Sequence, residues 1–79
     1  MTYGNRIRDI LSDANNLVGI EDRVRIYTRE TADKITALFT DTQFVFEEEP
    51  WPNNAGAACF ISWIDERKKL CSVVFNIYY

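Results

Sequence analysis

The last third of the chain, AACFISWIDERKKLCSVVFNIYY (residues 57–79), constrains the fold more than any other stretch. Two apolar segments with alternating side chains flank a charged run at residues 65–69, a pattern that predicts a β-hairpin. Pairing Ile64 with Leu70 keeps each side chain on one face, whereas a one-residue slip would mix the two faces. The sequence therefore predicts one register and a hairpin with two apolar faces.

The two faces of this hairpin carry different residues. The first face consists of Cys59, Ile61, Trp63, Cys71, Val73, Phe75 and Ile77. The apolar residues of the second face are Phe60, Ile64, Leu70 and Val74. Either each face is covered by one helix, or the second face stays uncovered and serves self-association or partner binding, because exposed apolar patches mark such sites. The sequence leaves both alternatives open.

The rest of the chain predicts two helices and two more strands. Apolar residues recur at helical spacing over residues 7–18, with Gly19 as a C-terminal cap. A short strand at 23–28, a helix at 29–40 that Thr28 can cap, and a strand at 42–47 follow. We therefore predict a single α+β domain over residues 1–79, with two helices on one face of a small, mainly antiparallel sheet in the order α-β-α-β-β-β.

Acidic residues concentrate in the middle of the chain. The net charge is −3 overall, but residues 30–66 carry eight acids and one lysine. The stretch EEEPWPNNAG (47–56) is read as an acidic loop with a tryptophan between two prolines. We predict a partner-binding site made of Asp41, Glu47, Glu48, Glu49 and Trp51, which would favour a basic protein surface. Trp51 is either an exposed anchor or a lid over one end of the sheet.

Catalytic and cofactor chemistry find little support in the sequence. Histidine is absent, no glycine-rich phosphate loop occurs, and two cysteines alone do not make a zinc site. The predicted register holds Cys59 and Cys71 roughly 13 Å apart, too far for a disulfide. We predict free thiols in a cytoplasmic protein, no metal, no cofactor and no enzymatic activity. The longest strictly apolar run, residues 57–61, is too short to cross a membrane.

Arg23, Arg25 and Tyr27 form a basic and aromatic stripe, with Val24 and Ile26 expected to face inward. Such a stripe is typical of single-strand nucleic-acid binders. A solvated edge strand explains it better, because the net charge is negative and arginines discourage edge-to-edge pairing.

Taken together, these features predict a non-enzymatic protein-binding module. Size and charge favour a phage-type or mobile-element-type inhibitor that blocks the basic, nucleic-acid-binding surface of a host protein such as a CRISPR effector. The alternatives are a self-associating module, such as a homodimer, that uses Phe60, Ile64, Leu70 and Val74, and a nucleic-acid binder that uses Arg23, Arg25 and Tyr27. Nucleic acid and membranes are the disfavoured partners.

Overall fold

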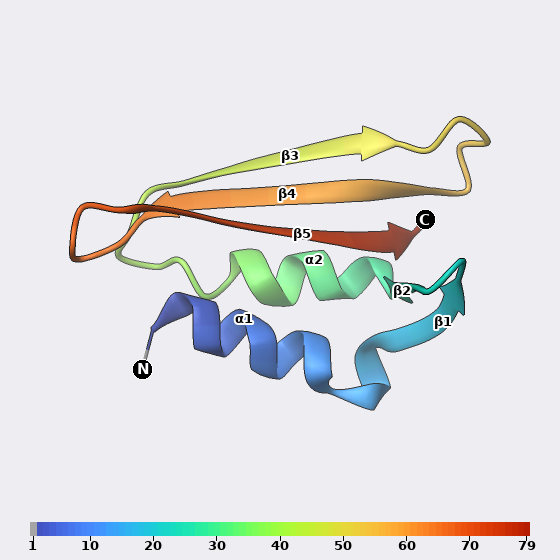
Figure 1. The fold of residues 1–79 in the computed structure, drawn as a ribbon, viewed down its shortest axis with the longest axis horizontal. Helices are drawn as coiled ribbons and strands as arrows, with labels where there is room; N and C mark the ends of the chain where they lie inside the picture. The colour runs from blue at the N-terminus through green and yellow to red at the C-terminus, as the bar shows by residue number, and fades with distance from the viewer. Residues whose placement is uncertain (1) are drawn as a thin grey trace.

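The computed structural model describes residues 2–79 as two α-helices and one five-stranded sheet. The elements are α1 (Tyr3–Ser12), the 3₁₀ turn η1 (Ala14–Asn16), β1 (Leu17–Glu21), β2 (Val24–Tyr27), α2 (Arg29–Thr36), β3 (Phe44–Pro50), β4 (Gly56–Ile64) and β5 (Leu70–Tyr78). Neighbouring strands follow the order β1-β2-β5-β4-β3 (Figure 1). The predicted α+β class is confirmed, and the predicted element order lacks only β1.

Strands β3, β4 and β5 form the antiparallel meander that the sequence predicts. The β4–β5 register runs from Gly56 opposite Tyr78 to Ile64 opposite Leu70, as expected. Asp65 closes this hairpin, because its Oδ1 accepts hydrogen bonds from the backbone N–H groups of Arg67 and Lys69, both at 2.9 Å. Alternation and turn chemistry thus agree, which is why a local pattern is enough to define the register.

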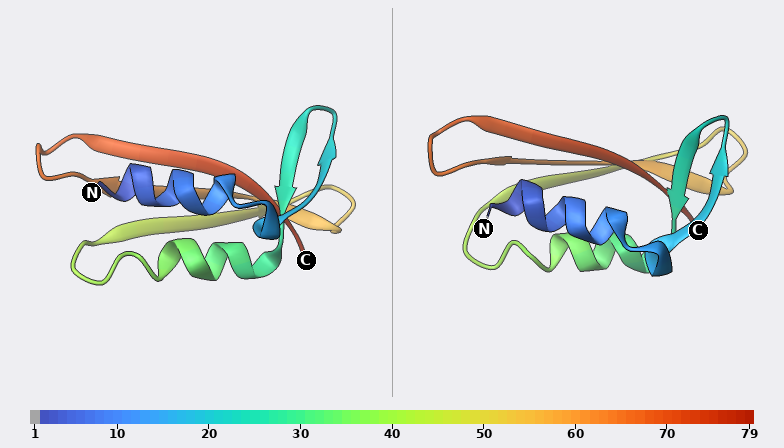
Figure 2. Two further views of the ribbon diagram at one scale, coloured as in Figure 1. Left: turned by 90° about the horizontal axis from the view of Figure 1, so that it is seen from below. Right: turned by 60° about the horizontal axis from the view of Figure 1, so that its bottom comes forward.

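The β1–β2 hairpin joins the sheet through very few contacts. β2 runs parallel to β5 but pairs with it only at Ile26 with Asn76 and Tyr27 with Ile77. Beyond these pairs the hairpin stands away from the meander at a steep angle, as both views in Figure 2 show. One side of β5 is therefore left without a neighbouring strand over most of its length.

Both helices lie on the same side of the meander (Figures 1 and 2). Ile7 of α1 and Ile35 of α2 are fully buried against the first hairpin face. The residues of that face that are buried in the core are Cys59, Ile61, Trp63, Phe75 and Ile77. The prediction that the helices cover one face is confirmed, and a helix on each face is excluded.

The first helix is shorter than its apolar spacing predicts. α1 is capped by Thr2, whose hydroxyl accepts a hydrogen bond from the Asn5 N–H, and it ends at Ser12 rather than near residue 18. Buried Asn16 secures the exit, because its Nδ2 donates to the Ile10 carbonyl at 2.8 Å and its Oδ1 accepts from Lys34 of α2. Leu17 and Gly19 consequently lie in β1, so the predicted cap role of Gly19 is wrong.

Strand β1 was not predicted from the sequence, because the turn that follows it contains no glycine. Asp22 and Arg23 both have positive φ angles, 50° and 68°, in the two-residue turn to β2. Hairpin turns of this kind favour asparagine, aspartate or glycine at the first of these positions and glycine at the second, where this chain has Arg23. Without that signal, Leu17 continues the helical spacing of Ile7 and Ile10 in the sequence.

Candidate functional site

The second face of the meander is uncovered in the structure. We call it the open face and define it by Val45, Phe60, Ile64, Leu70 and Val74. These side chains are between 37% and 70% exposed, with Phe60 the least and Leu70 the most exposed. They come from three adjacent strands, so the open face is continuous across the sheet. It is the largest cluster of exposed apolar side chains among residues 2–79 that shares one sheet face.

Two of the three predicted glutamates lie on the open face. Glu47 sits in one cross-strand row with Phe60 and Val74, and Glu49 lies opposite Ala58 one row further along. Glu48 projects to the opposite face of β3, and its carboxylate accepts a hydrogen bond from the Tyr79 hydroxyl at 3.1 Å. The predicted strand ends at Glu47, but β3 continues through Glu48 and Glu49 to Pro50. The three acids therefore alternate in direction and do not form one cluster at the end of the strand.

Asp41 does not join these glutamates. It precedes β3, whereas Glu49 lies near the end of the same strand. With about 3.3 Å of rise per residue, the strand separates the two ends by roughly 15–20 Å. The structure therefore divides the predicted partner-binding set into Asp41 at one end and Glu47, Glu49 and Trp51 toward the other.

Trp51 folds back over one end of the sheet. Its Nε1 donates to Asn76 Oδ1 at 3.0 Å, and its ring meets Tyr78 edge-on with centroids 5.6 Å apart. A Cβ atom at Gly56 would come within 2.7 Å of the Trp51 ring, so only glycine fits beneath it. Trp51 is half-buried and has the geometry of a lid, which ends the open face on that side.

The arginine stripe loses its aromatic member. Tyr27 is 5% exposed, and its hydroxyl donates to the Leu11 carbonyl at 2.9 Å. Val24, expected to face inward, is 44% exposed instead. Because Tyr27 packs toward α1, it cannot stack on a base, and the predicted assignment of these side chains to the two faces is wrong at both positions.

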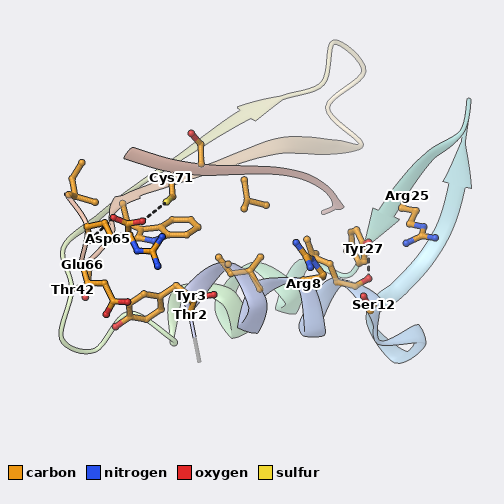
Figure 3. Close-up of a pocket in the computed structure, with 18 residues that line it drawn as sticks. Thr2, Tyr3, Arg8, Ser12, Arg25, Tyr27, Thr42, Asp65, Glu66 and Cys71 are labelled. Atoms are coloured by element: carbon orange, nitrogen blue, oxygen red, sulfur yellow. Dashed lines mark hydrogen bonds between the residues drawn. The ribbon is translucent and has the colours of Figure 1, made fainter. Parts of the chain in front are cut away.

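A groove runs between α1 and the adjacent edge of β5 (Figure 3). Its volume is about 990 Å³. Ile7, Leu11, Trp63 and Val73 supply apolar lining. Arg8 and Arg25 lie at the end next to β2, and Asp65 and Glu66 lie at the other end (Figure 3). Sequence reasoning missed this groove, because its two arginines come from α1 and β2 and share no local pattern.

Backbone geometry shows that the β5 edge beside the groove is unpaired. The Asp65 N–H bonds to the Lys69 carbonyl and the Tyr79 N–H bonds to the Ala55 carbonyl, so the odd-numbered residues of β5 point their backbone groups at β4. The even-numbered residues point the other way, and β2 reaches only Asn76 and Ile77. Within residues 2–79, the backbone groups of Leu70, Ser72 and Val74 therefore face no strand. We call them the free edge of β5.

Burial and hydrogen bonding shift the pKa values of several ionisable groups near these surfaces. Burial, and secondarily the charge of Glu48, raises the pKa of the Cys59 thiol to about 11. Burial also raises the pKa of Cys71, which is only half-buried at the groove. Hydrogen bonds from the backbone of Lys69, and more weakly of Arg67, lower the pKa of Asp65. Both cysteines are free, as the register predicted.

Residues 2–79 contain no group of three or more acidic or cysteine side chains placed to hold a metal ion. Neither helix in this part of the chain is long and apolar enough to cross a membrane. Comparison with protein-family models, curated proteins and solved structures finds no match for the chain. The site must therefore be interpreted from its own geometry.

Proposed function

We propose that this protein is a protein-binding module whose binding surface is the open face. The observation that carries the proposal is the exposure of Val45, Phe60, Ile64, Leu70 and Val74 on one sheet face while both helices lie on the other. Burying such side chains stabilises a complex by about 25 cal/mol per Å² of apolar surface before the costs of association. An uncovered patch of this kind favours a protein partner.

The acidic charge of the open face favours a partner with basic side chains. Glu47 and Glu49 lie on the open face alongside Phe60 and Ala58, and the net charge is −3. A partner with an apolar patch beside lysine or arginine side chains complements this surface best. The finer form of the proposal is a cytoplasmic inhibitor, of the type that phages and mobile elements encode, that covers a basic nucleic-acid-binding surface of a host protein. Small size and acidic charge support this form by analogy only.

Self-association is the second candidate, and the same exposure favours it. Two copies that pack their open faces together would bury Leu70 and Val74 without any other partner. Glu47 and Glu49 would approach their counterparts in many such arrangements, which disfavours tight homodimers at neutral pH. Light scattering over a range of protein concentrations separates the two candidates, because only self-association gives a mass that rises with concentration.

A matched pair of variants tests the open face itself. Val74→Glu places a charge on the open face, and Ile20→Glu places the same charge on β1 at a side chain of similar exposure, 62% against 57%. Both variants should remain folded because neither side chain is buried. Proteins captured by the wild type and by Ile20→Glu but not by Val74→Glu would support the proposal. If the wild type is monomeric and every captured protein survives Val74→Glu, the open face is not the binding surface.

A further inference from the structure

The free edge of β5 has the geometry of an acceptor for an added strand. Leu70, Ser72 and Val74 direct backbone N–H and C=O groups away from β4, and no strand within residues 2–79 pairs with them. From Leu70 to Val74 the edge is roughly 13 Å long, enough for an extended peptide of about five residues. Extended peptides bind exposed edges through main-chain hydrogen bonds and use side-chain pockets for selectivity.

The two outer edges of the meander differ in how they are protected. The outer edge of β3 carries Glu48, and Pro50 removes a backbone donor there. Charges and prolines at an edge discourage strand addition. In contrast, β5 has no charged residue between Leu70 and Tyr78. Of the two outer edges, only the free edge of β5 lacks charged residues and proline, so it is the edge suited to pairing with an added strand.

Beside this edge, the groove supplies room and apolar contacts for alternate side chains of a peptide. Half-buried Leu11 of α1 and Val73 of β5 line this groove of about 990 Å³, together with the nearly fully buried Ile7 and Trp63. A peptide strand on the free edge would point every second side chain toward this lining. Apolar residues at alternating positions would fit it best.

At the β2 end, the space beside the free edge of β5 is closed. β2 already occupies it at Asn76 and Ile77, so a peptide on the free edge must stop or turn when it reaches β2. Arg8 and Arg25 line the groove at this closed end, whereas the acids Asp65 and Glu66 lie at the far end (Figure 3). A chain end that carries a negative charge fits there, and a positively charged amino terminus does not.

We propose that the groove binds the C-terminal segment of a partner protein as an added strand parallel to β5. The parallel direction brings the terminal carboxylate to the closed end, next to Arg8 and Arg25. The preceding residues hydrogen-bond to the free edge and place apolar side chains on half-buried Leu11 and Val73. Leu70 and Val74 give their side chains to the open face and their backbone groups to this site. Peptide binding as proposed uses only the backbone edge and the groove, so the inference goes beyond the proposed function and does not depend on it.

Fluorescence polarisation with three labelled hexapeptides tests the site. The peptides share an alternating Val-Thr sequence and end in a free carboxylate, in a carboxamide, or in an aspartate carboxamide. We expect saturable binding of the free acid. Both amides should bind at least about tenfold more weakly than the free acid. Binding should also weaken with added salt. Equal affinity for the free acid and the simple amide, or equal affinity for the aspartate amide, would overturn the role of the terminal carboxylate.

Variants of the arginines connect the peptide end to the groove. The double variant Arg8→Ala/Arg25→Ala should lower affinity for the free acid about tenfold and leave that for the amide unchanged, since the interaction requires both partners. Arg6→Ala is the matched control, because Arg6 is an exposed arginine of α1 outside the groove lining. A double variant that binds the free acid as tightly as the wild type contradicts the proposal.

Amide hydrogen exchange tests the strand addition directly in the wild-type protein. The free acid should slow exchange at the backbone N–H groups of Ser72 and Val74, which face away from β4. Exchange at Cys71 and Val73 should stay unchanged, because their N–H groups already bond to β4. Unchanged exchange at Ser72 and Val74 under saturating peptide would overturn the added strand. Val45→Glu, on β3, should leave peptide affinity intact, so failure of the open face and failure of the groove are distinguishable.

Discussion

Phe75 and Val74 are neighbours in β5, yet they lie on opposite faces of the sheet, one buried and the other exposed. Phe75 is 3% exposed beneath the helices, and Val74 is 57% exposed on the open face. Both faces are apolar in sequence, so composition does not separate them. The difference arises because α1 and α2, with ten and eight residues, form a single layer on one side. Residues 2–79 contain no third α-helix that could cover the other side.

The largest contrast is expected from alanine substitutions at these two neighbours. Phe75→Ala should cost about 3–5 kcal/mol, because it leaves a cavity under the helices. That is a large share of the roughly 5–15 kcal/mol available to a small domain. Val74→Ala should change stability by less than about 0.5 kcal/mol. Thermal and denaturant unfolding measure both, and equal costs at the two positions would contradict the assignment of faces.

Trp51 provides an intermediate case, since it partly covers one end of the open side. Trp51→Ala should cost roughly 2 kcal/mol, less than a fully buried tryptophan, and lower the melting temperature by about 10 °C. Trp51→Phe keeps a ring over Gly56 but loses the bond to Asn76, so it should cost about 1 kcal/mol. An unchanged melting temperature for Trp51→Ala, together with a loss of partner affinity of about 2 kcal/mol, would make Trp51 an exposed anchor instead.

Thiol labelling compares depth on the covered side with exposure on the open side. At pH 8, Cys59 should react slowest, because it is fully buried and its pKa is raised to about 11, which keeps it protonated. Half-buried Cys71 should react faster, and a cysteine introduced by Ser72→Cys on the exposed side should react fastest. Mass spectrometry over time gives the order. Faster labelling of Cys59 than of Cys71 would contradict the predicted depth.

The smallest effect is expected at the most exposed open-face residue. Leu70→Thr should leave the free energy of unfolding within about 0.5 kcal/mol of the wild type, because Leu70 is 70% exposed. It should nevertheless weaken whatever binding the open face provides. Denaturant unfolding checks stability, and the capture experiment checks binding. A destabilisation of several kcal/mol would show that the open face is covered within the chain.

The sequence predicts those parts of the structure in which local and long-range preferences agree. The β4–β5 register is correct because two alternating strands and one short turn leave no equivalent slip. β1 was missed because Leu17 continues a helical spacing, while Asp22 and Arg23 carry no glycine signal. Charge and proline predict that this strand ends at Glu47, yet Glu48 and Glu49 continue β3 and pair with β4 at the sheet edge.

The candidate sites divide in the same way. Phe60, Ile64, Leu70 and Val74 were predicted to share a face, because side-chain alternation is a local property of a strand. Only the tertiary structure decided that this face stays open, because it depends on where α1 and α2 are placed by the chain connections. The groove is likewise a tertiary feature. Arg8 and Arg25 lie 17 positions apart in sequence, and only the short β2–β5 pairing leaves an unpaired edge between them and the β4–β5 turn.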